Sequence, residues 1–321
     1  MMVTVRTPYR LPIVGGLSDV EPYASRFGGR TLSVTLDRYV HVTVQPSLDG
    51  RWSLTLDGHT THFQEPSEAP IEAVAGVLTR HGPEEPLAVT VRNDLAPAGG
   101  LAASGALTVG LVHALALHEG AQLNAAELAA RAAQVEVFDL NGASGYHDSA
   151  ICAHGGLRQF TYDAQGAHLD TWQANQRAWQ TLKQTVRVFD TGRQTPSGPS
   201  LRKLAASMGT KIPALERMKV AVTVAGDALN AGDAAGLAHA VRLQQTEKMG
   251  LAGNFTSPDV AALVRAFDTR GVAVQIPGGK IGRYLFTCDP SGRHDAYGDL
   301  LPNATPVAAG FAALGSEATT T

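Results

Sequence analysis

Residues 6–23 read RTPYRLPIVGGLSDVEPY. The apolar stretch Leu11–Val14 leads into a glycine pair, and Asp19 lies just beyond that pair. A carboxylate just past a tight turn can accept hydrogen bonds from the hydroxyl groups of a ligand. The same spacing also suits a simple β-turn that the aspartate caps. The stretch therefore predicts either a ligand-binding loop or a structural turn.

A second glycine-bearing loop precedes an expected helix. Residues 97–106 read PAGGLAASGA, and Ala102–Leu117 has apolar residues at helical spacing. Glycines expose backbone N–H groups, and a helix N-terminus adds unpaired donors, so this loop suits a phosphate. Ser104 could add a hydroxyl to a phosphate or to a magnesium ion. The Gly-Lys-Ser/Thr of a Walker A loop is missing, and an ordinary loop of closely packed small residues is the alternative.

A third loop, residues 277–283, reads PGGKIGR and lies between two short expected strands, Val272–Ile276 and Tyr284–Thr287. It suits a flexible turn, or a loop that brings Lys280 or Arg283 near an anion.

An acidic pair completes the candidate chemistry. Glu136 lies near the end of an expected helix, Asn124–Phe138, and Asp148 follows a glycine-bearing loop. Phosphoryl transfer needs a carboxylate to hold the metal and a group to receive the hydroxyl proton, and these two acids could supply both. Two acids in a chain with 29 carry little weight alone. His147, beside Asp148, is more typical of a local hydrogen-bonding residue than of a catalyst.

Composition excludes several classes of protein. The 321 residues are 44% hydrophobic and 17% charged, with a net charge of −3 and no basic run, so a nucleic-acid partner is not expected. The two cysteines, Cys152 and Cys288, are too far apart in sequence for a CxxC pair. A polar N-terminus and the absence of an apolar run of about 18 residues predict a soluble, cytoplasmic protein without membrane contact.

The order of elements predicts an α+β fold. Strands are expected at Thr31–Val44, Arg51–Leu56, Leu87–Val91 and Leu157–Tyr162, and helices over 201–251, broken near Pro213, and at Val260–Thr269. Because strands and helices do not alternate regularly, two lobes are expected, 1–165 and 166–302. The Ala-, Gly-, Ser- and Thr-rich segment 303–321 is expected to be a flexible tail.

Together these motifs resemble the GHMP kinase superfamily, which includes galactokinase, homoserine kinase and mevalonate kinase. Residues 6–11 and 15–23 are similar to R-x-P-x-R-(I/L) and G-G-x-(S/T)-D-x-x-x-Y, which open the branch of D-glycero-D-manno-heptose 7-phosphate kinases and fucokinase-type sugar kinases. Residues 100–106 resemble G-L-G-S-S-x-A, and residues 145–148 and 155–157 resemble G-x-Q-D and G-G-L. The resemblance implies a ribosomal protein S5 domain 2-like N-terminal lobe and a ferredoxin-like C-terminal lobe.

The resemblance also implies an ATP- and Mg²⁺-dependent kinase of a sugar or sugar phosphate, monomeric or homodimeric. Arg10 would steady the transferred phosphoryl group, and Asp148 would orient or deprotonate the acceptor hydroxyl. Glu136 would hold magnesium together with Ser104. The residues expected at the nucleotide phosphates are Gly99, Gly100, Leu101, Ala103 and Ser104. Those expected at the substrate are Gly16, Ser18, Asp19, His147, Lys280 and Arg283.

Two departures from the family pattern keep a second hypothesis open. The family's G-S-S is Ala102-Ala103-Ser104 here, and alanine restricts the backbone where φ must be positive. In the third loop, Lys, Ile and Arg replace small residues of a run resembling G-A-G-G-G-G-F. These residues could bind an anionic acceptor, or their bulk could close the nucleotide site. The alternative is therefore a catalytically weak or inactive ligand-binding protein on the same fold.

Overall fold

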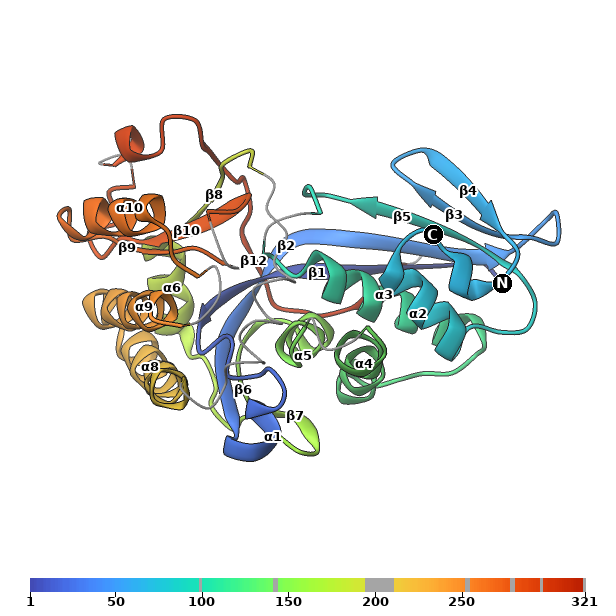
Figure 1. The fold of residues 1–321 in the computed structure, drawn as a ribbon, viewed down its shortest axis with the longest axis horizontal. Coiled ribbons are helices and arrows are strands. Elements are labelled where there is room, and N and C mark those ends of the chain that lie inside the picture. The colour runs from blue at the N-terminus through green and yellow to red at the C-terminus, as the bar shows by residue number, and fades with distance from the viewer. Residues whose placement is uncertain are drawn as a thin grey trace.

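The computed structural model describes residues 1–97, 100–140, 144–193, 211–251, 255–277, 281–294 and 297–319. This part of the chain contains a large sheet of nine strands and a small sheet of four. Helices pack on both sheets, and the long strands β1 and β2 extend through the middle of the molecule (Figure 1). Strands and helices are mixed without regular alternation, which confirms the α+β prediction.

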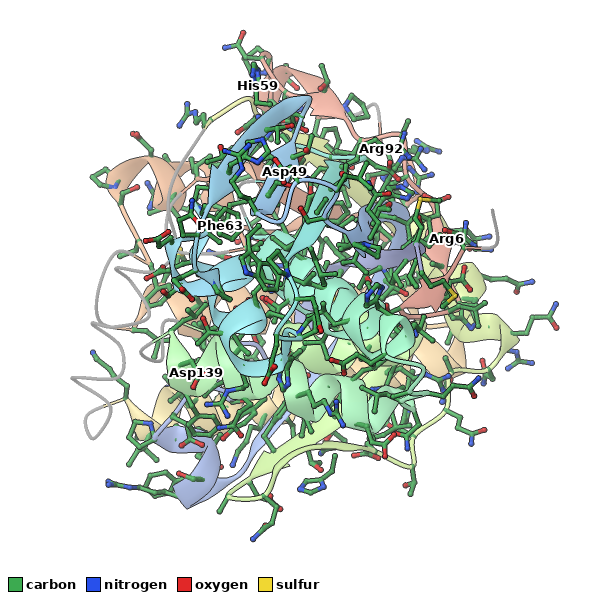
Figure 2. All side chains as sticks on the ribbon, turned by 90° about the vertical axis from the view of Figure 1, so that its right-hand side faces the viewer. Arg6, Asp49, His59, Phe63, Arg92 and Asp139 are labelled. Atoms are coloured by element: carbon green, nitrogen blue, oxygen red, sulfur yellow. The ribbon has the colours of Figure 1, made fainter. Side chains whose placement is uncertain are left out.

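The large sheet has the strand order β13-β1-β2-β5-β3-β4, with β6 and β12 paired to β2 and β7 paired to β6. All its neighbouring strands are antiparallel except β3 and β5. Figure 2 turns the end with β3 and β4 toward the viewer and labels Asp49, His59 and Phe63 there. The strands are β1 Val3–Val14, β2 Gly29–Pro46, β3 Trp52–Leu56, β4 His59–Phe63, β5 Leu87–Asn93, β6 Leu157–Asp163, β7 Gly166–Leu169, β12 Phe311–Ala312 and β13 Glu317–Ala318.

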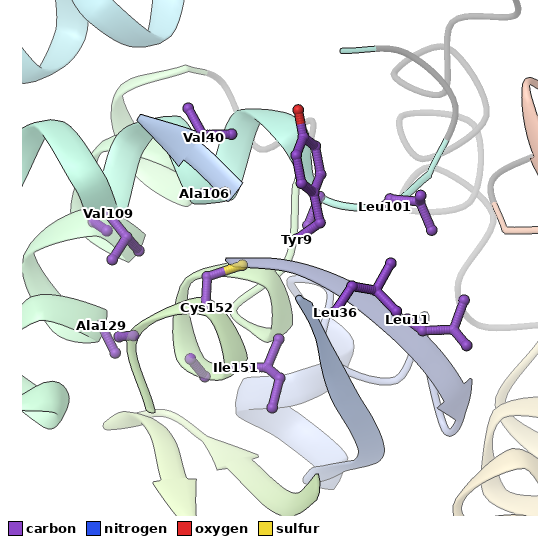
Figure 3. Packing of buried hydrophobic residues seen from close by; sticks show 14 of the residues in the cluster. Tyr9, Leu11, Leu36, Val40, Leu101, Ala106, Val109, Ala129, Ile151 and Cys152 are labelled. Carbon is purple, nitrogen blue, oxygen red and sulfur yellow. The ribbon is translucent and has the colours of Figure 1, made fainter. Parts of the chain in front are cut away.

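Helix α3, Ala103–His118, packs on β1 and β2 of the large sheet and is buried along most of its length. Its small residues allow this close packing, since a Cβ on Gly110 would lie 2.9 Å from the Thr7 hydroxyl of β1. Figure 3 shows the cluster in which α3 packs on β1 and β2, including Tyr9, Ala106 and Val109. The other helical elements between residues 1 and 154 are α1 Tyr23–Phe27, η1 Pro66–Glu68, α2 Glu72–His81, α4 Ala125–Ala133, η2 Gln134–Asp139 and α5 His147–His154.

The small sheet has the order β11-β8-β10-β9 and is antiparallel throughout. Phe189 and Leu285 of this sheet, together with Phe267 of α10 and Tyr297, belong to a second hydrophobic cluster. The elements are α6 Gln176–Thr185, β8 Val186–Asp190, α8 Ile212–Ala231, α9 Ala234–Met249, α10 Pro258–Asp268, β9 Ala273–Gln275, β10 Tyr284–Cys288, η4 Gly298–Leu300 and β11 Thr305–Pro306. Across the described ranges, no helix is both long and apolar enough to cross a membrane.

Several local features follow directly from short stretches of the sequence. Asn124 caps α4, and its side chain and that of Glu127 bond each other's backbone N–H groups. Asp57 and Gly58 both have positive φ in the turn between β3 and β4, as a two-residue hairpin loop requires. The helix expected over Asn124–Phe138 changes to a π-helical turn at Gln134, so Glu136 lies in that turn.

Two other expectations concern the helical segment 201–251 and the lobe boundary. In the described part of the chain α8 begins at Ile212 with Pro213 in its first turn, and a further break lies at Gly232, which has φ +79° and ends the helix. Residues 201–210 lie outside the described part of the chain. β7 continues the large sheet to Leu169, past residue 165, and the division into two lobes stays a prediction.

The segment expected to be a flexible tail is instead paired with both sheets. β11 pairs with β8, β12 with β2 and β13 with β1. Residues 314 and 315 also pass so close to α5 that a Cβ on Gly315 would lie 2.0 Å from the carbonyl oxygen of Ala153. Its composition suggested disorder, but small residues are what such a close backbone approach requires.

Replacement of Gly315 by alanine should therefore lower the free energy of unfolding by about 1–3 kcal/mol, because the backbone must move to fit the methyl group. Gly298→Ala is the matched control, since a Cβ there meets no atom within 4 Å, and its effect should stay within about 0.5 kcal/mol. Urea denaturation measures both values. Equal effects of the two substitutions would contradict the close approach.

Candidate active site

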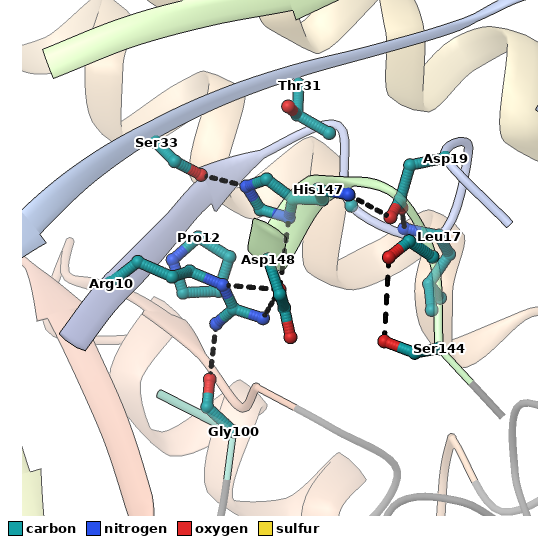
Figure 4. A network of polar contacts seen from close by, with 12 residues as sticks. Arg10, Pro12, Leu17, Asp19, Thr31, Ser33, Gly100, Ser144, His147 and Asp148 are labelled. Atoms are coloured by element: carbon teal, nitrogen blue, oxygen red, sulfur yellow. Dashed lines mark hydrogen bonds and ion pairs between the residues drawn. The ribbon is translucent and has the colours of Figure 1, made fainter. Parts of the chain in front are cut away.

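Arg10 on β1 and Asp148 in the first turn of α5 form an ion pair. The guanidinium Nε and Nη2 lie 2.9 and 2.6 Å from the same carboxylate oxygen, Oδ1 of Asp148 (Figure 4). Nη1 donates to the carbonyl oxygen of Gly100 at 2.5 Å. Arg10 is buried and Asp148 is half-buried. Since Arg10 uses only Oδ1, the second carboxylate oxygen of Asp148 is left for another donor.

Asp19 lies close to this pair and is itself buried, with 5% of its surface exposed. Its two carboxylate oxygens accept hydrogen bonds from the backbone N–H groups of Leu17, at 3.0 Å, and His147, at 3.1 Å. A Cβ on Gly145 would lie 2.0 Å from the carboxylate, so this position needs glycine. Burial, together with the negative charge of Asp148, raises the pKa of Asp19 to about 6.

His147 and Ser18 are placed differently from the prediction that they contact the substrate. The His147 ring is buried against β2, where Nε2 contacts the Ser33 hydroxyl (Figure 4). Burial lowers the pKa of His147 to about 3, so the imidazole is neutral near pH 7. The buried Ser18 hydroxyl bonds the Gly15 and Arg30 backbones. Both side chains are therefore placed to hold the loop around Asp19.

The loop before α3 lies against Arg10, which donates to the carbonyl oxygen of Gly100. Gly100 has φ +94°, and a Cβ there would lie 2.6 Å from Cβ of Pro277. Ala102 precedes α3 with φ +61°, which confirms that alanine takes the left-handed conformation where the family pattern has glycine. Leu101 is buried and Ala103 half-buried, and Gly99 lies outside the described residues. We refer to residues 100–104 as the phosphate loop.

Ser104 and Glu136 meet on the other side of this loop. The hydroxyl groups of Ser104 and Thr108 donate to Oε1 of Glu136 at 2.7 and 2.5 Å. Glu136 is buried, and burial raises its pKa. In the described part of the chain its hydrogen-bonding partners are neutral hydroxyls. A buried carboxylate beside an exposed serine hydroxyl is an oxygen donor set that fits Mg²⁺, which usually takes few protein ligands along with phosphates and water.

Arg283 and Gly16, both expected at the substrate, make other contacts in the structure. Nε of Arg283 pairs with Oδ2 of Asp190 on β8 at 2.9 Å, so its guanidinium is held at the small sheet. The Gly16 carbonyl accepts a hydrogen bond from Gln244. Lys280 lies outside the described residues. The structure thus brings together Arg10, Asp19, Gly100, Ser104, Glu136 and Asp148.

Three buried polar residues of α9 were not predicted from the sequence: Gln244, Gln245 and Lys248. Gln244 bonds the backbone of Gly15, and Lys248 bonds the carbonyl of Ile276. Polar residues in a helix usually mark its solvent-exposed face, so their spacing gave no signal of a role at the site.

Known proteins resemble this chain in sequence and in fold. Residues 69–156 match the model of the GHMP kinases N terminal domain. The chain is 33% identical over 151 residues to a mevalonate kinase of Methanothermobacter thermautotrophicus, an alignment that covers 43% of this chain and 50% of that protein. It is 25% identical over 169 residues to a D-glycero-alpha-D-manno-heptose 7-phosphate kinase of Campylobacter jejuni, covering 49% and 50%. The chain thus spans about half the length of the curated relatives it matches.

The fold is shared over the whole chain. A crystal structure of a D-glycero-D-manno-heptose 1-phosphate kinase from Bacteroides thetaiotaomicron superposes with a TM-score of 0.79 at 19% identity, covering 100% of this chain and 99% of that one. The Lactococcus lactis galactokinase complexed with galactose superposes with a TM-score of 0.73 at 13% identity, covering 98% and 95%. The matched domain and the shared fold confirm the resemblance: residues 69–156 match the GHMP kinases N terminal domain, and the chain has the fold of these kinases.

Proposed function

We propose that the protein is an ATP- and magnesium-dependent kinase that transfers the γ-phosphoryl group of ATP to a hydroxyl of a sugar or sugar phosphate. The observation that carries this proposal is the Arg10–Asp148 pair, which lies against the phosphate loop at Gly100. It places a cation and a carboxylate beside a loop suited to phosphates. Phosphoryl transfer needs positioning and charge neutralisation more than covalent chemistry.

Each residue then has a defined task. The acceptor hydroxyl donates its hydrogen bond to the free oxygen of Asp148, which orients it and receives its proton as the bond to phosphorus forms. Arg10 stabilises the negative charge that develops on the transferred phosphoryl group. Ser104 and Glu136 would hold Mg²⁺, which supplies charge neutralisation to the nucleotide phosphates. Asp19 accepts hydrogen bonds from other hydroxyl groups of the acceptor.

Asp19 favours a polyhydroxylated acceptor, because two fixed carboxylate oxygens suit vicinal hydroxyl groups. The relatives differ on this point: one is a mevalonate kinase and the other a heptose phosphate kinase. A buried carboxylate beside the reacting site favours the sugar over the isoprenoid precursor. We also propose that Lys280 and Arg283 contact an anionic acceptor. Arg283 would then have to leave its ion pair with Asp190 or share its N–H donors between Asp190 and the acceptor.

The second candidate is a ligand-binding protein without turnover. Ala102 favours it, because a left-handed alanine costs about 1–2 kcal/mol and its methyl group stands where the family pattern has none. A titration with magnesium and a non-hydrolysable ATP analogue separates the two candidates. Saturable, magnesium-dependent binding supports the kinase, whereas a folded protein that binds sugar phosphate but no nucleotide supports the second candidate.

Asp148→Asn should reduce kcat by roughly 10²–10⁴-fold, because the acceptor hydroxyl loses its proton acceptor. ADP affinity should stay nearly unchanged. Turnover is measured with the best acceptor from a screen of sugars, sugar phosphates and mevalonate. Asp163→Asn, an exposed carboxylate on β6, is the control. Full activity in Asp148→Asn would remove Asp148 from the proposed mechanism.

Asp19 should titrate near pH 6, since burial and the charge of Asp148 raise its pKa. Acceptor affinity should rise as the pH increases through this value, because the ionised carboxylate accepts hydrogen bonds at both oxygens. Carbon-13 NMR of the carboxyl group gives the midpoint. Asp148→Asn removes the neighbouring charge and should move the midpoint to lower pH. A wild-type midpoint near the ordinary value of about 4 would contradict the burial of this carboxylate.

Glu136→Gln should abolish the dependence of nucleotide affinity on magnesium while leaving the fold intact. The amide oxygen can still accept from Ser104 and Thr108, but the negative charge that attracts the cation is gone. Thermal shift with nucleotide, with and without magnesium, measures the effect. Glu119→Gln, exposed at the far end of α3, is the control. Equal magnesium dependence in Glu136→Gln and wild type would place the metal elsewhere.

A further inference from the structure

Helix α9 contacts two loops of the candidate site through consecutive buried glutamines. Gln244 and Gln245 are each 1% exposed. Oε1 of Gln244 accepts from the N–H of Gly15 at 2.8 Å, and its Nε2 donates to the Gly16 carbonyl at 3.3 Å. Oε1 of Gln245 accepts from the N–H of Ile276 at 3.2 Å. One helix thus fixes the turn before Asp19 and the strand end that leads to Pro277.

Lys248 lies one turn further along the same face of α9. Its Nζ donates to the carbonyl oxygen of Ile276, so α9 binds both backbone groups of that residue. Lys248 is 4% exposed, and Nζ lies 5.9 Å from the ring centroid of Phe255. Among the described residues no carboxylate pairs with it. Burial, together with the charge of Arg10, lowers the pKa of Lys248 to about 7.

An amine buried without a carboxylate is costly, and an apolar side chain of the same length would fill the space. The cost points to a task that an apolar residue could not perform. The residue after Ile276 is Pro277, which packs against Gly100. The carbonyl of Gly100 in turn accepts from Arg10. The phosphate loop is therefore held between Arg10 on one side and Pro277 on the other.

We propose that Lys248 is a positioning residue for the phosphate loop: by holding the Ile276 carbonyl it fixes Pro277 against Gly100, and its cation adds to that of Arg10 behind an anionic ligand. The expected effect of Lys248 on ligand binding rests on the proposed nucleotide site, whereas its expected effect on the order of the phosphate loop does not. Lys248 touches no reacting group and acts through Ile276 and Pro277.

The variant Lys248→Met distinguishes a positioning role of Lys248 from a purely structural one. Methionine fills the space without a buried charge, so the melting temperature should stay within about 4 °C of wild type. Hydrogen exchange in the peptide covering 100–108 should accelerate at least roughly threefold. Affinity for ADP with magnesium should fall by roughly tenfold or more, as for other small misplacements of a site.

Lys219→Met is the matched control. Lys219 on α8 also donates to backbone carbonyls, those of Phe27 and Gly28, but far along the chain from the phosphate loop. Its replacement should leave both exchange at 100–108 and ADP affinity unchanged. If Lys248→Met lowers the melting temperature strongly while exchange at 100–108 matches that of Lys219→Met, Lys248 is structural only and the proposal is overturned.

Two further measurements test the proposal if Lys248→Met does not fold or if the wild-type protein binds no ADP. Gln245→Leu removes the bond to the other backbone group of Ile276 and should loosen the same peptide, which tests the linkage if Lys248→Met does not fold. If wild-type protein binds no ADP, the proposed kinase function fails, while accelerated exchange at 100–108 in Lys248→Met would still support the positioning role. Unchanged exchange in both variants would overturn it.

Discussion

The buried guanidinium of Arg10 touches two chain segments at once: it donates two hydrogen bonds to Asp148 and a third to the carbonyl of Gly100. A buried charge is costly unless it is paired and hydrogen-bonded, so these contacts fix where both segments lie. Arg10 itself is held by β1, whose pairing with β2 is the longest in the large sheet. The start of α5 and the loop before α3 are thereby aligned to the sheet, and Asp148 is aligned to residues 100–104.

The site around this ion pair holds more negative than positive charge. Burial raises the pKa of both Asp19 and Glu136, and the charge of Asp148 raises each further. Arg10 opposes the effect at Asp19. Carboxylates with perturbed pKa values cluster at functional sites because a ligand or metal supplies the missing partner. The electrostatics therefore suit a cation and a polyhydroxylated ligand better than an empty, purely structural arrangement.

The loops that surround the site combine strain with close packing. Leu17 and Ala102 adopt positive φ, a conformation that glycine takes at no steric cost. Gly105 packs on Asp148, and Gly145 packs on Asp19, each leaving no room for a side chain. Strain of this kind persists only where surrounding contacts enforce it. The backbone of the site is thus determined by its neighbours, among which the buried side chains of α9 are the most distant in sequence.

The sequence by itself determined the local features. The capping box at Asn124, the turn at Asp57, helix α3 and most strands follow from patterns a few residues long, and those patterns report backbone preferences that neighbours in sequence set. The motif resemblance added Arg10, Ser104, Glu136 and Asp148 as a group, which the fold brings together.

Only the tertiary structure decided which side chains face the site and which are used elsewhere. His147 turns to Ser33, Arg283 pairs with a residue 93 positions away, and the C-terminal segment joins both sheets. Lys248 becomes a buried amine because Ile276 and Phe255 pack against it. Burial, and with it pKa and hydrogen-bonding partner, depends on residues far apart in the chain, and no local pattern records those contacts.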